Sequence, residues 1–429
     1  MEFSLSAGGS KVSNATDLSH LDVSQPEFFE NDTWMAGFAE LRKSSPVHYT
    51  ENSTNGAYWS VVSHELIKQV DIDHKTFSSE RGGITIVDTV EADSMGNDDD
   101  GLAIAAKSFI NMDEPEHKKQ RLAVSPSVAP KNLAELQPLI RERAADILDN
   151  LPVGETFNWV ELVSVDLTAR MLATLFGFPY EQRGKLIEWS DLTTNVPQVT
   201  GDDSIDMGAR RAELLKAAET FYGLWAEREK QPPQFDLISM LIHNPETAKM
   251  NEDPALFLGN ILLLIVGGND TTRNSISGGV LGLNQFPEQF DKLKKDPSLI
   301  PNMVSEMIRW QTPVIHMRRT AMKDVELGGK LIKEGEKVVM WYLSGNRDET
   351  VFENPDQLII DRPNAREHVA FGFGVHRCMG NRLAELQLQI LWEEILKRFK
   401  SVEVVGDVQR SSNNFIRGIT DLPVQVQPL

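Results

Sequence analysis

Residues 371–380 read Phe-Gly-Phe-Gly-Val-His-Arg-Cys-Met-Gly, and they hold the only cysteine of the 429-residue chain. The two glycines ahead of the histidine give the backbone a freedom that residues with a Cβ lack, so the loop can curl and direct amide groups at the sulfur. A helix is expected next, because apolar residues recur at helical spacing through 379–399. Cys378 is therefore predicted at a helix N-terminus, where the helix dipole and Arg377 favour a thiolate.

Other interpretations of this cysteine fit less well. An inert buried cysteine is commoner in general, but it needs neither the glycines nor the flanking His376 and Arg377. A dinucleotide fingerprint requires a third glycine where Arg377 stands, and no histidine lies at zinc-ligand spacing from the cysteine. A cysteine nucleophile with His376 as its base stays open. Gly380, expected one turn into the helix, leaves room for something flat and bulky against the backbone.

The decapeptide resembles the haem-binding loop of the cytochrome P450 monooxygenases, F-G-x-G-x-H-x-C-x-G, at every fixed position. The resemblance implies that Cys378 is the axial thiolate ligand of a haem b iron, the ligand type that pushes electron density towards O–O cleavage. It also implies that Phe371 packs against the thiolate and that His376 and Gly380 contact the haem.

Composition agrees with this class of protein. A formal charge of −20 argues against nucleic acid as a partner, and a single cysteine excludes a disulfide framework and suits a reducing cytoplasm. The first 31 residues are polar and contain no signal region, and the longest apolar run, Ile261–Val266, is too short to cross a bilayer. We therefore expect a cytoplasmic protein with no membrane anchor.

The pattern predicts a mainly α fold with a small β lobe, and the resemblance makes this the cytochrome P450 fold. Residues 1–21 are expected to form a flexible arm, and residues 22–429 a single haem domain whose β-rich lobe takes in 46–80 and 320–345. Helical periodicity dominates 133–293, with breaks at 177–179 and 231–233. Strands are expected at Pro46–Thr50, Tyr58–Val62, Val325–Leu331 and Lys337–Leu343, with the two distant pairs meeting in one sheet.

An acidic stretch, Asp93–Gly101, superficially suggests a calcium loop. Its register fails, because Lys107 falls where a bidentate glutamate belongs. A solvated acidic loop is expected instead, and the resemblance would place it over part of a substrate cavity.

A second motif, Gly-Gly-Asn-Asp-Thr-Thr-Arg at 267–273, lies inside a long helix predicted to begin with Asp253 as its N-cap. Two glycines inside a helix cost about 1 kcal/mol each relative to alanine. The Thr271 hydroxyl could bond to the carbonyl of Gly267 and open a local kink. Equally, one helix could end at the glycines and Asp270 could cap the next.

This motif resembles the oxygen-activating stretch of the same family, which implies catalytic roles. Thr271 would hydrogen-bond to dioxygen and order a water molecule, and Asp270 would relay protons from solvent. Cleavage of the O–O bond needs protons at the distal oxygen only, which an alcohol beside an acid can supply.

Two further matches extend the resemblance. Glu306 and Arg309 reproduce the Glu-x-x-Arg pattern, and Arg362 stands where its third member belongs; the alternative for the first two is a solvated helical pair worth a few tenths of a kcal/mol. For the haem propionates, the resemblance supplies His117 and Arg121, four residues apart on one helical face, together with Arg319 and His376.

Two stretches resemble a soluble bacterial branch of the family that hydroxylates alkanes and fatty acids at the terminal carbon. They are Gly-Gly-Asn-Asp-Thr-Thr-Arg-Asn-Ser at 267–275 and His-Met-Arg-Arg-Thr-Ala at 316–321. The expected substrate is a medium-chain, apolar small molecule held in a narrow slot with little polar anchoring. The predicted walls of this slot are Leu263, Leu264, Gly267, Val314, Ile315, Met317, Ile416 and Ile419.

Electrons are expected from a 2Fe-2S ferredoxin and an NAD(P)H-dependent ferredoxin reductase, because the chain leaves no room for a flavin domain after the haem region. Arg377, Arg382, Lys397 and Arg398 form a candidate docking patch, or alternatively they complement a helix C-terminus. Other functions to be weighed are hydroxylation of a terpene or steroid-like substrate, a haem-thiolate peroxygenase and a haem-based sensor or binding protein. Dependence of product formation on NAD(P)H and ferredoxin separates these classes.

Overall fold

The computed structural model describes residues 21–88 and 107–429. The predicted arm, apart from its last residue, and the acidic stretch Asp93–Gly101 lie outside the described residues. The α-helices are α1 (Pro26–Glu30), α2 (Met35–Ser44), α3 (His64–Ile72), α5 (Glu116–Val124), α6 (Pro130–Asp149), α7 (Asp166–Phe176), α8 (Gly184–Thr194), α9 (Pro197–Thr200), α10 (Met207–Arg228), α11 (Leu237–Ile242), α12 (Pro254–Gln285), α13 (Pro287–Lys295), α14 (Ile300–Gln311), α15 (Tyr342–Gly345) and α16 (Asn381–Leu396).

The strands form one larger sheet and three small ones. They are β1 (Val47–Thr50), β2 (Tyr58–Val61), β3 (Phe77–Ser78), β4 (Phe157–Asn158), β5 (Met317–Ala321), β6 (Val325–Leu327), β7 (Lys330–Ile332), β8 (Lys337–Met340), β9 (Phe399–Val404), β10 (Gln409–Arg410), β11 (Ile419–Asp421) and β12 (Pro423–Pro428). The five-stranded sheet has the order β1-β2-β8-β5-β3, and the others are β4-β12-β9, β6-β7 and β10-β11.

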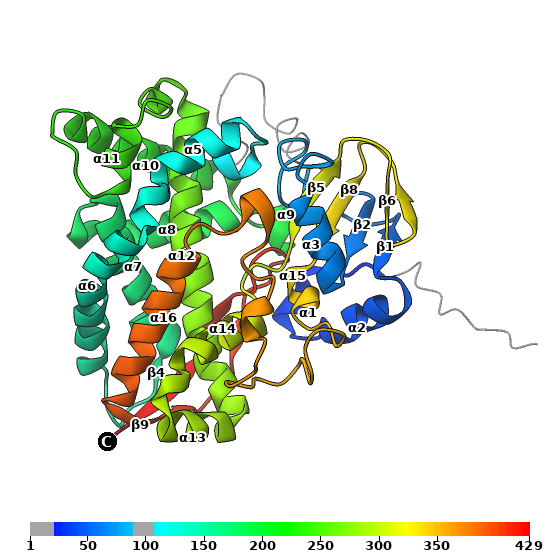
Figure 1. Ribbon diagram of the computed structural model, residues 1–429. Helices are drawn as coiled ribbons and strands as arrows, with labels where there is room; N and C mark the ends of the chain where they lie inside the picture. The colour runs from blue at the N-terminus through cyan, green and yellow to red at the C-terminus, as the bar shows by residue number, and fades with distance from the viewer. Residues whose placement is uncertain (1–20, 89–106) are drawn as a thin grey trace, which may run out of the picture.

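The predicted pairing of distant strands is confirmed, because β2 pairs in parallel with β8 with Trp59 opposite Val338. Residues 325–332 form a separate hairpin instead of joining this sheet. Strand β5, which the sequence did not single out, fills the place between β8 and β3. The mainly helical class and the small β lobe are both confirmed, and Figure 1 shows the sheet with α1, α2 and α3 at one side of the helical part.

Helix α12 runs through the middle of the helical part and packs against α7, α8, α14 and α16 (Figure 1). Asp253 caps the N-terminus of this helix, as predicted, because its side chain accepts a hydrogen bond from the Leu256 amide. Small residues let neighbouring helices approach closely: a Cβ on Gly279 would lie 2.9 Å from the Met307 sulfur. By length and composition this helix could cross a membrane, but 56% of its most apolar window is buried inside the protein. It is therefore the core helix of the fold.

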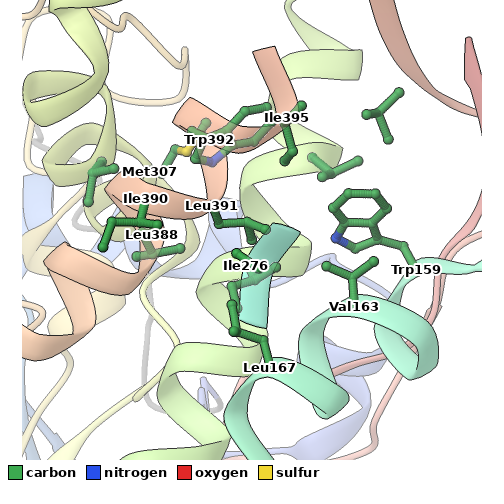
Figure 2. Packing of buried hydrophobic residues seen from close by; sticks show 14 of the residues in the cluster. Trp159, Val163, Leu167, Ile276, Met307, Leu388, Ile390, Leu391, Trp392 and Ile395 are labelled. Carbon is green, nitrogen blue, oxygen red and sulfur yellow. The ribbon is translucent and has the colours of Figure 1, made fainter. Parts of the chain in front are cut away.

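The largest apolar cluster joins α12, α14 and α16 to α6, α7 and the short π-helix Val160–Val165. Figure 2 shows Leu391 of α16 next to Ile276 of α12, with Trp159 at the right of the view, and all three belong to this cluster. A second cluster surrounds α8, α10 and α11. The predicted breaks are also present: α7 ends at Gly177, whose φ of 60° suits glycine, and the proline pair at 232–233 falls between α10 and α11.

Candidate functional site

One cavity of about 760 Å³ lies between the cysteine loop and α12. Its lining comes from α5, the end of α8, the start of α10, the middle of α12, the segment around β5 and the cysteine loop. The structure thus brings together side chains that are more than 250 residues apart in sequence. Most of the predicted haem, catalytic and substrate residues are among them.

The cysteine loop curls as the glycines predict. Gly372 and Gly374 have φ of 64° and 63°, the left-handed region that residues with a Cβ avoid. The space around them is also closed, because a Cβ on Gly374 would collide with the carbonyl oxygen of Asp71 on α3. The loop then closes on itself where the Cys378 amide donates to the Phe371 carbonyl at 2.7 Å.

Two expectations for this loop need correction. Gly380 lies at the N-cap of α16 and not one turn inside it, although a Cβ there would still meet nothing within 4 Å. The pKa of the Cys378 thiol is raised, because its burial outweighs the amides of Gly380 and Asn381 and the charges of Arg121 and Arg377. The surroundings alone therefore do not favour the thiolate. A metal bound directly to sulfur would remove the proton outright.

Cys378 is exposed to the cavity, and the protein encloses it on its other sides. Its open face is where a flat group would lie. On α12, a Cβ added to Gly267 would also meet nothing within 4 Å. The cavity therefore has flat, unfilled backbone at both Gly380 and Gly267, which suits a planar macrocycle.

Two histidines at the cavity lack the partners that buried polar groups normally have. His117 on α5 is 1% exposed, and neither of its ring nitrogens has a hydrogen-bond partner. His376 stands against it with 4.1 Å between ring centroids; its Nε2 lies 3.1 Å from the Ser79 hydroxyl, and its Nδ1 is unpartnered. Burial lowers the pKa of His117 to about 4. An anionic group with acceptor oxygens would satisfy both rings, so these residues fit a haem and its propionates.

The two predicted cationic partners also line the cavity. Arg121 donates to the Arg377 carbonyl at 2.5 Å, which ties α5 to the cysteine loop. Arg319, which is 2% exposed, pairs with Asp71 at 3.0 Å. All four predicted propionate contacts are therefore gathered at one place, with Arg319 shared between the cavity and a protein carboxylate.

The glycines of α12 have separate structural reasons. Helix α12 continues through 267–273, so the alternative in which Asp270 caps a second helix is wrong. Thr271 donates its hydroxyl to the Gly267 carbonyl at 3.0 Å, as predicted, and both residues line the cavity. Gly268 instead allows close packing on α7, where a Cβ would come within 2.7 Å of Leu172.

Asp270 points away from the cavity, towards α8. It is fully buried and accepts from Ser190 at 3.1 Å and Thr194 at 3.3 Å. Arg273 lies 3.0 Å away and also pairs with Asp191, whose side chain is 41% exposed. Burial raises the pKa of Asp270, and Arg273 opposes that rise. A carboxyl group that keeps its proton more readily than usual is thus connected to the surface through one ion pair.

Six of the eight predicted substrate contacts line the cavity, and two do not. The prediction that Ile315 contacts the substrate is wrong. Its side chain packs in the core of the β lobe with Trp341, whereas Val314 and Met317 border the cavity. Ile419 is also wrong, because it begins β11 and packs into the largest apolar cluster. Those that do line the cavity are Leu263, Leu264, Gly267, Val314, Met317 and Ile416.

The alternative of a solvated pair at Glu306 and Arg309 is wrong. Both side chains are fully buried and form two bonds, at 2.7 and 2.8 Å. Arg362 donates to both carboxylate oxygens of the same glutamate at 3.0 Å. One carboxylate thus joins α14 to the segment before the cysteine loop.

A second step connects this cluster to the loop itself. Asn346 accepts from Arg309 through its backbone carbonyl at 2.6 Å and from the Val369 amide through its side chain at 2.7 Å. The Val369 carbonyl in turn accepts from the Gly372 amide at 2.8 Å. The buried charges therefore position the backbone that leads into Cys378.

The four basic residues of the candidate docking patch do not form one surface in the structure. Lys397 pairs with Glu394 at 2.6 Å, and Arg398 pairs with Glu394 and Asp149. They follow the end of the 16-residue helix α16, about 24 Å from its start. The alternative, complementation of a helix C-terminus, fits these two residues, while Arg377 and Arg382 lie exposed at the other end.

Sequence reasoning missed two residues of this region. Asp71 on α3 accepts hydrogen bonds from Arg319, from the Tyr342 hydroxyl at 2.8 Å and from the Phe373 amide at 3.0 Å. The last of these bonds holds the cysteine loop against α3. Arg210 on α10 lines the cavity and is 9% exposed. Neither belongs to a motif, and only the fold brings them to the site.

Comparisons with known proteins agree with this geometry. A family model described as cytochrome P450 matches residues 209–427. The solved structure of cytochrome P450-153 from Novosphingobium aromaticivorans is 47% identical and superposes with a TM-score of 0.85, covering 95% of this chain and 99% of that one. Linalool 8-monooxygenase from Pseudomonas putida is 35% identical over 95% of this chain and 99% of its own length. Steroid C26-monooxygenase from Mycolicibacterium smegmatis is 33% identical over 89% of this chain and 88% of its own length.

Proposed function

The chain belongs to the cytochrome P450 family, and from that premise we propose that this haem b monooxygenase hydroxylates the terminal carbon of medium-chain alkanes or fatty acids. The observation that carries the proposal is the cavity, where apolar side chains of α12 and of the segment before β5 line the same space as Thr271 and Cys378. Haem bound through Cys378 supplies the activation of dioxygen, because a thiolate ligand pushes electron density towards the O–O bond.

The histidines and arginines of the cavity would hold the cofactor. His117 and His376 would donate to the propionates, which explains why both ring nitrogens of His117 and Nδ1 of His376 are buried without a partner in the protein. Arg121 and Arg319 would neutralise the propionate charge. Phe371 lines the cavity in the same loop as Cys378 and would limit access of water to the sulfur.

Protons would pass along α12. The reaction replaces one C–H hydrogen of the substrate with a hydroxyl group, and the second oxygen atom leaves as water after taking up two electrons and two protons. Asp191 meets solvent, Arg273 connects it to Asp270, and the Thr271 hydroxyl borders the cavity. Asp270 would hold a proton in reserve, and Thr271 would orient the water that delivers it.

Attack at the terminal carbon would be set by shape. A methyl C–H bond is stronger than the neighbouring methylene C–H bond, so an unrestrained oxidant would prefer the inner carbon. Side chains such as Leu263, Val314 and Ile416 would admit one chain end and keep inner carbons away. The names of two relatives agree, because C26 of a steroid and C8 of linalool are methyl carbons at chain ends.

Electrons would come from a 2Fe-2S ferredoxin with its NAD(P)H-dependent reductase. The exposed Arg377 and Arg382 lie at the cysteine end of α16, where an acidic carrier would approach the haem most closely. The single cysteine is consistent with a reducing cytoplasm. The two relatives named above favour one second candidate, hydroxylation of a branched terpene or a steroid side chain.

A reconstituted system tests these alternatives. We expect dodecane and dodecanoic acid to give hydroxylated products that require NAD(P)H, ferredoxin and reductase together. Product only from linalool or a sterol would favour the second candidate. Equal rates with hydrogen peroxide alone would indicate a peroxygenase, and no product from any substrate would favour a sensor or binding protein.

A further inference from the structure

Arg210 stands out among the charged residues of the cavity. It lies in the first turn of α10, is 9% exposed and contributes to the cavity lining. Its Nε donates to the Leu192 carbonyl in the last turn of α8 at 2.6 Å. Within the described part of the chain, neither Nη group has a hydrogen-bond partner, which leaves the outer edge of the guanidinium available to the cavity.

The contrast with other buried arginines is sharp. Within residues 21–88 and 107–429, every other arginine in the buried class has a carboxylate within ion-pair distance, as a buried cation requires. Those arginines are Arg309, Arg318, Arg319, Arg347, Arg362 and Arg417. Arg210 has none, and burial lowers its pKa with no opposing charge. An anion bound in the cavity would supply the partner that the described residues do not.

The surroundings of Arg210 also favour an anion. Its position in the first turn of a 22-residue helix puts a positive side chain beside the positive end of the helix dipole, an arrangement that a negative ligand relieves. Gln198 borders the cavity from the same region and can donate hydrogen bonds through its side-chain amide. Asp88 is the one acidic residue in the described lining, and it is already paired with Arg318 and Lys337.

The anion would be held away from the thiolate. Helix α10 packs against α8 and α11, whereas α16, which follows Cys378, packs against α6, α12 and α14. A molecule with one end at Arg210 and the other near Cys378 would lie along the apolar lining of the cavity. That description fits a long chain with a single acidic head.

We propose that Arg210 binds the carboxylate of an unbranched fatty acid and so directs its opposite, methyl end towards the haem. This assignment rests on the proposed function and narrows it, because a hydrocarbon would leave the guanidinium unpaired. The Nε bond to Leu192 serves a separate purpose, as a cation at a helix C-terminus. The planar fork of the guanidinium suits a carboxylate better than a lysine ammonium would.

Binding measurements on the haem-loaded protein test this role. Dissociation constants for dodecanoate and its methyl ester would be measured by calorimetry at pH 8 in the parent, Arg210→Gln and Arg210→Lys proteins. Arg210→Gln is expected to weaken dodecanoate binding by roughly 10- to 100-fold, with the ester changed less than about twofold. Arg210→Lys should retain only part of the preference. Lys216→Gln removes a charge from the exposed face of the same helix and should leave both constants unchanged.

Each outcome separates the two proposals. A parent protein that binds ester and acid equally well overturns the carboxylate role whatever happens to the variants, and so does an Arg210→Gln protein that loses both ligands equally. If dodecane is hydroxylated at its end while the acid preference is absent, the function stands and the anchor fails. If neither straight-chain ligand binds the parent, the proposed function itself fails.

Discussion

Thr271 and Asp270 are neighbours in sequence, but their side chains meet different surroundings. Thr271 borders the cavity and bonds to its own helix, whereas Asp270 is buried against α8 and reaches solvent through Arg273 and Asp191. The alcohol is therefore placed to orient water near the reacting oxygen, and the acid is placed to replace the proton. The two residues should fail in different ways when altered.

Thr271→Ala should separate electron use from product formation. The haem and substrate sites keep their shape, but the hydroxyl that orders the donated proton is lost, so electrons are released as hydrogen peroxide. We expect the product formed per NAD(P)H consumed to fall at least several-fold while substrate affinity holds. Thr271→Ser is the matched control and should stay near the parent value. Full coupling in the alanine protein would mean that the hydroxyl serves only the helix.

Asp270→Asn should slow turnover without comparable loss of coupling. The amide can still bond to Ser190 and Thr194 but cannot give up a proton, and general acid catalysis of this kind is worth roughly 100-fold or more. The measurement is turnover with its solvent deuterium isotope effect, which should increase. Asp191→Asn should have a smaller effect, because the Arg273 side chain is itself 16% exposed and so still meets solvent. An unchanged rate in the Asp270 variant would contradict the relay.

At the scale of elements, the cysteine loop depends on one glycine in particular. Gly374→Ala adds both left-handed strain and a collision with the Asp71 carbonyl. Strain of this kind alone costs about 1–3 kcal/mol, and the collision would displace α3 from the loop. We expect lower unfolding stability and faster haem loss. Gly329→Ala is the control, because Gly329 has a φ of 74° but nothing within 4 Å of a Cβ. Equal effects of the two substitutions would show that the contact with α3 is unimportant.

His316, just before β5, makes stability depend on pH. It is fully buried, donates through Nδ1 to the Asn414 carbonyl and accepts the Ile86 amide at Nε2, and burial lowers its pKa to about 3. A depressed folded pKa means that the unfolded chain binds the extra proton first. This contribution is therefore complete above pH 6.5 and is lost as the pH falls towards 3, by about 1.4 kcal/mol per pH unit.

The test compares the free energy of unfolding in urea at pH 7.5 and 5.5. The parent should lose more stability over this interval than His316→Gln, because glutamine can make both hydrogen bonds without taking up a proton. The difference between the two losses should be about 1.4 kcal/mol. Identical losses would show that His316 does not titrate as its burial requires.

For the whole molecule, sequence predicted the parts that depend on local rules. Glycines needing positive φ, the aspartate cap of α12 and the pairing of β2 with the distant β8 all follow from residue type and pattern, whereas the parallel direction of that pairing does not. The sequence did not predict which side chains face the cavity. Ile315 and Val314 are adjacent and similar, yet only the second borders it, because the facing of an irregular segment is set by tertiary packing.

Long-range charge pairing was equally out of reach. Asp71 meets Arg319 across 248 positions, and Arg210 is notable only because the fold leaves it without a carboxylate. The direction in which the pKa of Cys378 shifts could not be predicted for the same reason. Burial raises this pKa, and the depth of burial is a property of the complete fold. Sequence motifs therefore identify the haem-binding and catalytic residues, whereas tertiary packing determines which other side chains line the cavity.

In the function proposed above, the shape of this cavity directs oxygen to the end of an unbranched chain. The most direct measurement is the position of the hydroxyl group, by mass spectrometry, in the products from dodecane and dodecanoic acid under turnover with ferredoxin, reductase and NAD(P)H. We expect mainly terminal alcohols from the parent and more subterminal alcohol from Leu263→Ala, whose shortened side chain widens the slot. Mainly subterminal products from the parent enzyme would contradict it.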